Sequence, residues 1–90
     1  MSEVWERSAD VLWRRTATGV VVLPNNSSTA VALVGLQAAL WESLVRPLSV
    51  TAIAGTLAAH LPEEPTAAEH VIGEEVRHLV AIGAVRESND

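Results

Sequence analysis

The chain of 90 residues contains no cysteine and no lysine. The absence of cysteine excludes disulfide bonds, catalysis by a thiolate, and zinc held by cysteine ligands. All six basic side chains are therefore arginines, and they stand against eleven Asp and Glu residues, which gives a formal net charge of −5. Because a domain that binds nucleic acid usually presents a basic face, this balance disfavours DNA and RNA as partners.

Long apolar runs are also missing, although 49% of the residues are hydrophobic. The longest nearly uninterrupted run, Ala30 to Trp41, contains Gln37 and is well short of the roughly 20 residues that span a bilayer. We therefore expect no transmembrane helix and no membrane partner. The N-terminal segment MSEVWERSAD has no apolar stretch of the kind found in a secretory signal, so the expected location is the cytoplasm.

Sequence motifs of catalysis and of phosphate binding are absent as well. There is no Gly-x-Ser-x-Gly motif, no glycine-rich phosphate loop, and no histidine beside a recognisable Ser-acid pair. His70, Glu74 and His78 are spaced to share one helix face, but the zinc motif His-Glu-x-x-His does not occur. We therefore expect no enzyme activity, no catalytic residue, no metal and no cofactor.

Three apolar runs in the first third of the chain predict strands. The first run is Val11 to Arg15, and the segment Thr16-Ala17-Thr18-Gly19 joins it to the second, Val20 to Leu23. Pro24 and Asn25-Asn26-Ser27-Ser28 are turn residues that end the second run, and the third is Thr29 to Val34. Runs joined by such short turns predict a three-stranded antiparallel meander.

Apolar residues at helical spacing predict three helices after the strands. The first contains Leu36, Leu40 and Leu44, is about ten residues long, and ends before Pro47. The second extends from Val50 to Leu61 with Ser49 as its N-cap. The third begins at a capping box formed by Thr66 and Glu69 and continues to Gly83, a favourable C-terminal cap; Val85 is expected to pair briefly with the sheet.

The predicted fold is therefore α+β, a winged-helix-like domain with a three-stranded antiparallel sheet followed by three helices. We expect this domain to occupy residues 11–87. Residues 1–10 are expected to form an N-terminal arm that need not be ordered, and residues 88–90 a frayed C-terminus. Trp41 is predicted to lie in the core and Trp13 to be at least half-buried, while Trp5 is either part of the arm or an anchor on a partner enzyme.

Several segments in this order resemble one family. They are Val22-Leu23-Pro24, Ala32-Leu33-Val34, Ala38-Ala39-Leu40-Trp41-Glu42-Ser43-Leu44, Arg46-Pro47-Leu48-Ser49-Val50-Thr51-Ala52-Ile53 and Leu79-Val80-Ala81-Ile82-Gly83-Ala84-Val85. On them the chain resembles the PqqD-like proteins, the peptide chaperones of pyrroloquinoline quinone biosynthesis. More broadly, it resembles the elements that recognise precursor peptides of ribosomally synthesised, modified natural products. The resemblance covers roughly residues 11 to 87.

This resemblance implies a non-catalytic module that binds the leader segment of a precursor peptide and presents the peptide to a separate modifying enzyme or protease. In the family, the leader adds a strand to the third strand of the sheet and lies against the last helix. Carried over to this chain, the leader-binding residues are Ala30, Val31, Ala32, Leu33, Val76, Arg77 and Val80. An acidic leader residue is expected to pair with Arg77, although a solvated contact with Glu74 is the simpler expectation for that arginine.

Two other functions remain open. The same topology suits a small winged-helix regulator whose last helix enters a DNA groove, but Glu69, Glu74 and Glu75 on that helix would repel phosphate. A self-associating module, such as a homodimer closed through the strand edge, is the second alternative. Both the leader-binding and the dimer hypotheses need a free edge, whereas Ala30 to Val34 is also apolar enough for an interior strand.

Overall fold

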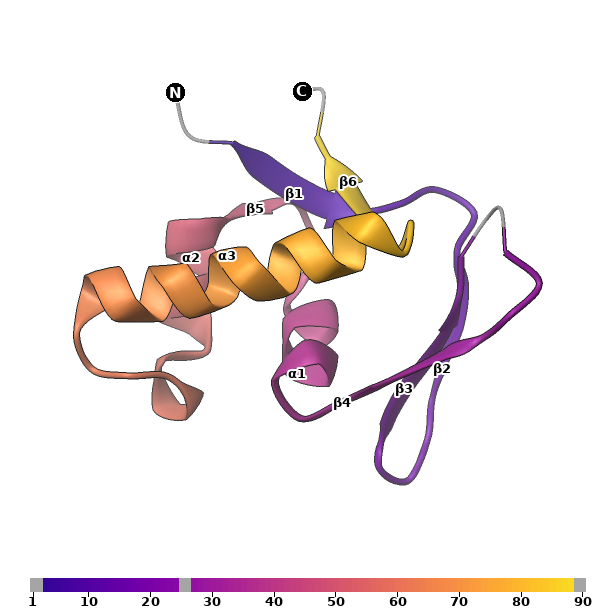
Figure 1. The fold of residues 1–90 in the computed structure, drawn as a ribbon, viewed down its shortest axis with the longest axis horizontal. Helices are drawn as coiled ribbons and strands as arrows, with labels where there is room; N and C mark the ends of the chain where they lie inside the picture. The colour runs from indigo at the N-terminus through magenta and orange to yellow at the C-terminus, as the bar shows by residue number, and fades with distance from the viewer. Residues whose placement is uncertain (1–2, 25–26, 89–90) are drawn as a thin grey trace.

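The structure is a computed structural model that describes residues 3–24 and 27–88. In this part of the chain the fold is α+β, with two small antiparallel sheets and three α-helices, which confirms the predicted fold class (Figure 1). The strands are β1 (Val4–Arg7), β2 (Leu12–Arg15), β3 (Gly19–Leu23), β4 (Val31–Val34), β5 (Leu48–Ser49) and β6 (Val85–Glu87). The helices are α1 (Gly35–Ser43), α2 (Val50–Thr56) and α3 (Pro65–Ala81), with a 3-10 turn η1 (Ala58–His60).

The first sheet, which we call the meander sheet, consists of β2, β3 and β4 in that order. Both pairings are antiparallel, with Trp13 opposite Val22 and Val21 opposite Ala32. The predicted three-stranded meander is therefore confirmed, although the turn expected at Asn25 and Asn26 lies outside the described residues. Within residues 3–24 and 27–88, β4 pairs with β3 alone, so it is an edge strand and not an interior one.

The second sheet, which we call the terminal sheet, was not predicted. Its central strand is β1, which pairs antiparallel with β5 on one side and with β6 on the other. Residues 4–7 therefore belong to the fold and not to an arm, because segments from the middle and the end of the chain satisfy their backbone groups. The Ser88 amide also donates a hydrogen bond to the Val4 carbonyl oxygen at 2.7 Å, so the described part of the C-terminus is not frayed. Val85 pairs as expected, but with β1.

The helices begin and end close to their predicted limits, with two differences. The Ser49 hydroxyl accepts a hydrogen bond from the Ala52 amide at 3.1 Å, as predicted for the N-cap of α2. However, α2 ends at Thr56, and the predicted stretch up to Leu61 is completed by the 3-10 turn η1. Apolar spacing alone does not distinguish a continuous helix from a helix followed by a tighter turn.

The second difference is the start of α3. The N-cap is Glu64, whose carboxylate accepts a hydrogen bond from the Ala67 amide at 2.7 Å, so the predicted capping box of Thr66 and Glu69 is wrong. Pro65 explains the earlier start, because proline suits the first turn of a helix, where its missing N–H is not needed. At the other end, Gly83 has a φ of 84° and caps the helix as predicted, with its amide bonded to the Val80 carbonyl oxygen.

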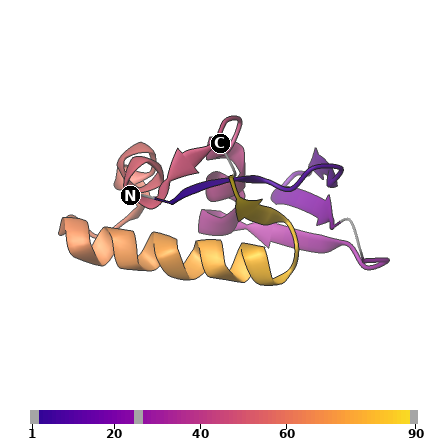
Figure 2. The same ribbon diagram turned by 90° about the horizontal axis from the view of Figure 1, so that it is seen from above.

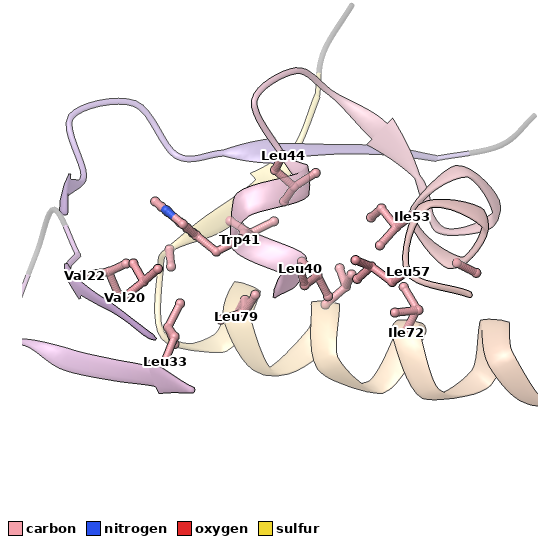
Figure 3. Packing of buried hydrophobic residues seen from close by; sticks show 14 of the residues in the cluster. Val20, Val22, Leu33, Leu40, Trp41, Leu44, Ile53, Leu57, Ile72 and Leu79 are labelled. Atoms are coloured by element: carbon pink, nitrogen blue, oxygen red, sulfur yellow. The ribbon is translucent and has the colours of Figure 1, made fainter. Parts of the chain in front are cut away.

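The core lies between α3, the other two helices and the inner face of the meander sheet (Figures 2 and 3). Its largest fully buried side chain is Trp41 on α1, which confirms the prediction for this residue. Trp13 is half-buried and packs against the core, also as predicted, and Trp5 packs there from β1. Among the described residues, no helix is long and apolar enough to cross a membrane.

Candidate functional site

The meander sheet has two edge strands, β2 and β4, and the hairpin between β2 and β3 decides which backbone groups of β4 face outward. The Thr16 amide donates to the Gly19 carbonyl oxygen at 2.8 Å, so the backbone of Gly19 is directed toward β2. Backbone groups alternate between the two sides of an antiparallel strand. Val20 and Val22 therefore direct their amide and carbonyl groups toward β4, where they face Leu33 and Val31.

It follows that Val31 and Leu33 use their backbone groups to bind β3, while Ala32 directs its amide and carbonyl, and Val34 its amide, toward the open edge. The Val34 carbonyl belongs to the start of α1, because Val34 is the N-cap of that helix. Ala30 lies just before β4 and is not part of the pairing with β3. The side chains alternate between the two faces of the sheet. Leu33 is 0% exposed and lies in the core, whereas Val34 is 56% exposed and Ala32 is also exposed. The edge therefore offers unpaired hydrogen-bonding groups beside small apolar side chains.

The close approach of β4 to β3 requires a glycine at position 19. A Cβ atom added at Gly19 would collide with the Leu33 carbonyl oxygen, and no side chain tolerates such a contact. Because that obstacle is backbone and not a flexible side chain, another residue at Gly19 would push the two strands apart. The geometry of the β4 edge thus depends on this glycine.

The predicted helix residues Val76, Arg77 and Val80 lie on α3, but they do not face β4. Val76 is 1% exposed, and with Arg77 it lines a cavity of about 450 Å³ whose other walls include Trp5 and Val50. Val80, which is 38% exposed, falls on the same flank because residues three and four apart are neighbours on a helix. In Figure 1, β1 and β4 lie on opposite sides of α3, so this flank is turned away from β4.

Arg77 also forms an ion pair with Glu74 on the same helix. Its guanidinium donates a hydrogen bond to Glu74 Oε1 at 2.7 Å, which confirms the simpler expectation for this side chain. An exposed pair of this kind contributes little to stability.

The opposite flank of α3 carries residues that the sequence prediction did not assign to the site. With Ile72 and Leu79 in the core, rotation by about 100° per residue places Val71, Glu75, His78 and Ile82 on the side of the helix away from Arg77. Helical spacing could have identified both flanks in advance. Only the three-dimensional arrangement shows that β4 lies on the side of this second flank (Figure 1).

A group of aromatic and charged side chains fixes the meander sheet against α1 and β1. The Arg7 guanidinium carbon lies 4.7 Å from the centre of the Trp13 ring and 4.8 Å from that of Trp41. The two rings meet edge to face with their centroids 5.8 Å apart. Arg15 on β2 binds both carboxylate oxygens of Glu42 on α1, at 2.6 and 2.8 Å, and this contact lowers the pKa of Glu42. These contacts set the position of the sheet that carries β4.

Metal chemistry has no candidate group in the described part of the chain, where no three His, Asp or Glu side chains are arranged to hold an ion. His70, Glu74 and His78 share a helix but do not form such a group. Comparison of the chain with protein-family models, with curated proteins and with solved structures gives no match.

Proposed function

We propose that this domain binds an extended peptide segment by adding it as a fourth strand to the open edge of β4. The natural ligand is the leader of a ribosomally synthesised precursor peptide, which the domain presents to a separate modifying enzyme or protease without catalysing a reaction itself. The observation that carries this proposal is the outward-facing backbone of Ala32, which has no partner among the described residues and lies next to the exposed side chain of Val34.

Strand addition would supply both affinity and selectivity. Ala32 offers one donor and one acceptor and Val34 offers its amide as a donor, and each hydrogen bond made there contributes about 1 kcal/mol net. Alternate side chains of the peptide would then meet the exposed apolar surface of Ala32 and Val34. Because β4 has only four residues, the interface is small, and we expect a dissociation constant on the order of micromolar.

The structure changes which helix residues the proposal assigns to the peptide. Arg77 lies on the flank away from β4, beside Trp5 and Val50, so an acidic residue of a peptide on β4 is not expected to reach it. The flank that carries Glu75, His78 and Ile82 is on the side of β4, so the proposal assigns these residues to the peptide in place of Val76, Arg77 and Val80 (Figure 1). Glu75 there favours a basic residue in the peptide over an acidic one.

The proposal is tested by fluorescence polarisation with a labelled peptide that corresponds to the leader of a short precursor encoded beside this protein. The core half of the same precursor is the control peptide. We expect saturable binding to the leader alone. Ala32→Pro should abolish it, because proline removes the outward N–H while the hydrogen bonds to β3 from Val31 and Leu33 remain. Ala32→Val keeps the N–H and should bind as the wild type does.

A folded Ala32→Pro protein that binds the leader with unchanged affinity would exclude strand addition at β4. Failure of the wild-type protein to bind either half of the precursor would exclude leader recognition altogether. Folding of each variant is checked by its far-UV circular dichroism and its thermal unfolding midpoint.

Self-association is a second candidate function, because the same open edge can pair with β4 of another copy. Sedimentation equilibrium over a range of concentrations separates the two candidates. A constant monomer mass favours leader binding, whereas a dimer that Ala32→Pro dissociates favours self-pairing.

A further inference from the structure

A second cavity, of about 440 Å³, lies between α2, the turn η1 and the beginning of α3. It is at the end of α3 that lies farther from the meander sheet (Figure 2). Its floor consists of small apolar residues, among them Ala54, Ala58 and Ala68, and two acidic side chains, Glu63 and Glu69, also line it. The cavity therefore combines a shallow apolar surface with negative charge.

Gly55 contributes no side chain to the wall of this cavity. It lies in the last turn of α2 and lines the cavity, and a Cβ atom added there would meet nothing within 4 Å. Packing thus does not require glycine, although glycine is less favourable in a helix than alanine by up to about 1 kcal/mol. Gly73, in the middle of α3, shows the same pattern where it lines the neighbouring 450 Å³ cavity, and Thr51 lines both cavities.

The two acidic side chains of the cavity are available for a ligand. Glu64, the residue between Glu63 and Pro65, is committed to capping α3, and the hydrogen bond from the Ala67 amide lowers its pKa. Neither Glu63 nor Glu69 has an ion pair or a side-chain hydrogen bond with any described residue. Two unpaired carboxylates beside an apolar surface are complementary to a cation that has an aliphatic stem.

We propose that this cavity binds an arginine side chain of a partner polypeptide. The aliphatic stem of the arginine would lie on Ala54, Gly55 and Ala58, and its guanidinium would reach Glu63 and Glu69. Arginine fits better than lysine because its planar group can donate to two carboxylates at once. This site is separate from β4, so it would let the domain hold a second segment while a peptide occupies the strand edge.

The test is a titration of ¹⁵N-labelled protein followed by NMR. The probe is the tripeptide acetyl-Ala-Arg-Ala-amide, and the control probe replaces arginine by citrulline, which has nearly the same shape but no charge. We expect the arginine peptide to shift the amide signals of Gly55, Ala58 and Ala68, and the citrulline peptide to bind at least about 10-fold more weakly. Equal binding of the two peptides, or shifts spread over the whole acidic surface, would overturn the proposal.

Substitutions inside and outside the cavity show where the arginine tripeptide binds. Glu63→Gln with Glu69→Gln should remove it, whereas Glu74→Gln with Glu87→Gln, which removes the same charge elsewhere, should leave it in place. Gly55→Leu should block it by filling the cavity, while the unfolding midpoint stays at or above that of the wild type. Retention of binding by either the Glu63/Glu69 variant or the Gly55 variant would contradict the proposed site.

Two further results separate this site from the strand edge and from self-association. Ala32→Pro should not change binding of the arginine tripeptide. The proposal of an arginine site and the proposal of leader binding at β4 can therefore be refuted independently of each other. If the protein forms a dimer that Glu63→Gln with Glu69→Gln dissociates, the occupant is an arginine of a second copy, and the assignment to a different partner polypeptide is wrong.

Discussion

Replacement of Arg7 by methionine should weaken the fold more than the loss of any other arginine, because Arg7 joins three elements. From β1, its Nε and Nη2 atoms donate to the Trp41 carbonyl oxygen at 3.2 and 2.7 Å. That oxygen belongs to the last turn of α1, where a cation also interacts favourably with the helix dipole. The same guanidinium lies over both the Trp13 and the Trp41 ring.

The expected cost follows from these contacts. A hydrogen bond from a charged donor contributes about 1.5–3 kcal/mol, and each cation–π contact about 0.5–2 kcal/mol. Methionine recovers part of the packing of the Arg7 side chain. Burial lowers the pKa of Arg7, because the charged guanidinium loses part of its hydration, and this desolvation offsets part of the stabilisation from the contacts. We therefore expect Arg7→Met to lower the free energy of unfolding by about 2–4 kcal/mol, out of a total of about 5–13 kcal/mol for a domain of this size.

The measurement is urea unfolding followed by tryptophan fluorescence, with Arg86→Met as the matched control. Arg86 lies on β6 in the same sheet and makes an exposed ion pair with Glu6 at 2.7 Å, so its loss should cost less than about 1 kcal/mol. If the two variants lose equal stability, the Arg7 guanidinium does not join the terminal sheet to α1 and the meander sheet as described.

Three other substitutions test particular contacts. Gly19→Ala should lower the free energy of urea unfolding by about 2–3 kcal/mol, because its Cβ would collide with the Leu33 carbonyl oxygen; an unchanged stability would mean that β3 and β4 lie farther apart. Gly73→Ala should raise the thermal unfolding midpoint, by the equivalent of about 0.5–1 kcal/mol, since the new methyl group meets nothing within 4 Å; a lower midpoint would contradict the open space at this position. The pKa of Glu64 is lowered from 4.5 in the folded state, so its capping contribution is complete above that pH and is lost as the pH falls through the lower folded value. Thermal unfolding from about pH 7 to about pH 3 should therefore show the difference between wild type and Glu64→Gln shrinking in the acidic range, and a constant difference would exclude a role for the carboxylate charge.

Local patterns in the sequence were sufficient to predict that the meander sheet and the three helices exist, although not where α2 ends and α3 begins. The strand from Val20 to Leu23 and the turn chemistry around it are properties of neighbouring residues, and Ser49 and Gly83 mark the ends of helices by their own side-chain and backbone preferences. The terminal sheet could not be found in this way. β5 has only two residues, and Glu6 is paired with Arg86, 80 positions away, so neither segment has a local pattern that indicates its partner.

The candidate site was only partly predictable for a related reason. The edge strand with Ala32 follows from the order of the runs, and the hairpin hydrogen bond at Gly19 then determines which amides face outward. The helix side depends on how α3 is rotated against the sheet. Val76 and Arg77 face β1 and α2, because the unpredicted strand β1 occupies that flank, and sequence spacing contains no information on this rotation.

Amide hydrogen exchange of β4, with and without the leader peptide, tests the central claim most directly. In the free protein, the amides of Val31 and Leu33 should be protected by their hydrogen bonds to β3, while those of Ala32 and Val34 exchange rapidly. Saturation with the leader should slow exchange at Ala32 and Val34, because the added strand supplies their missing acceptors. If these two amides still exchange rapidly in the saturated complex, the peptide does not bind as a strand on this edge.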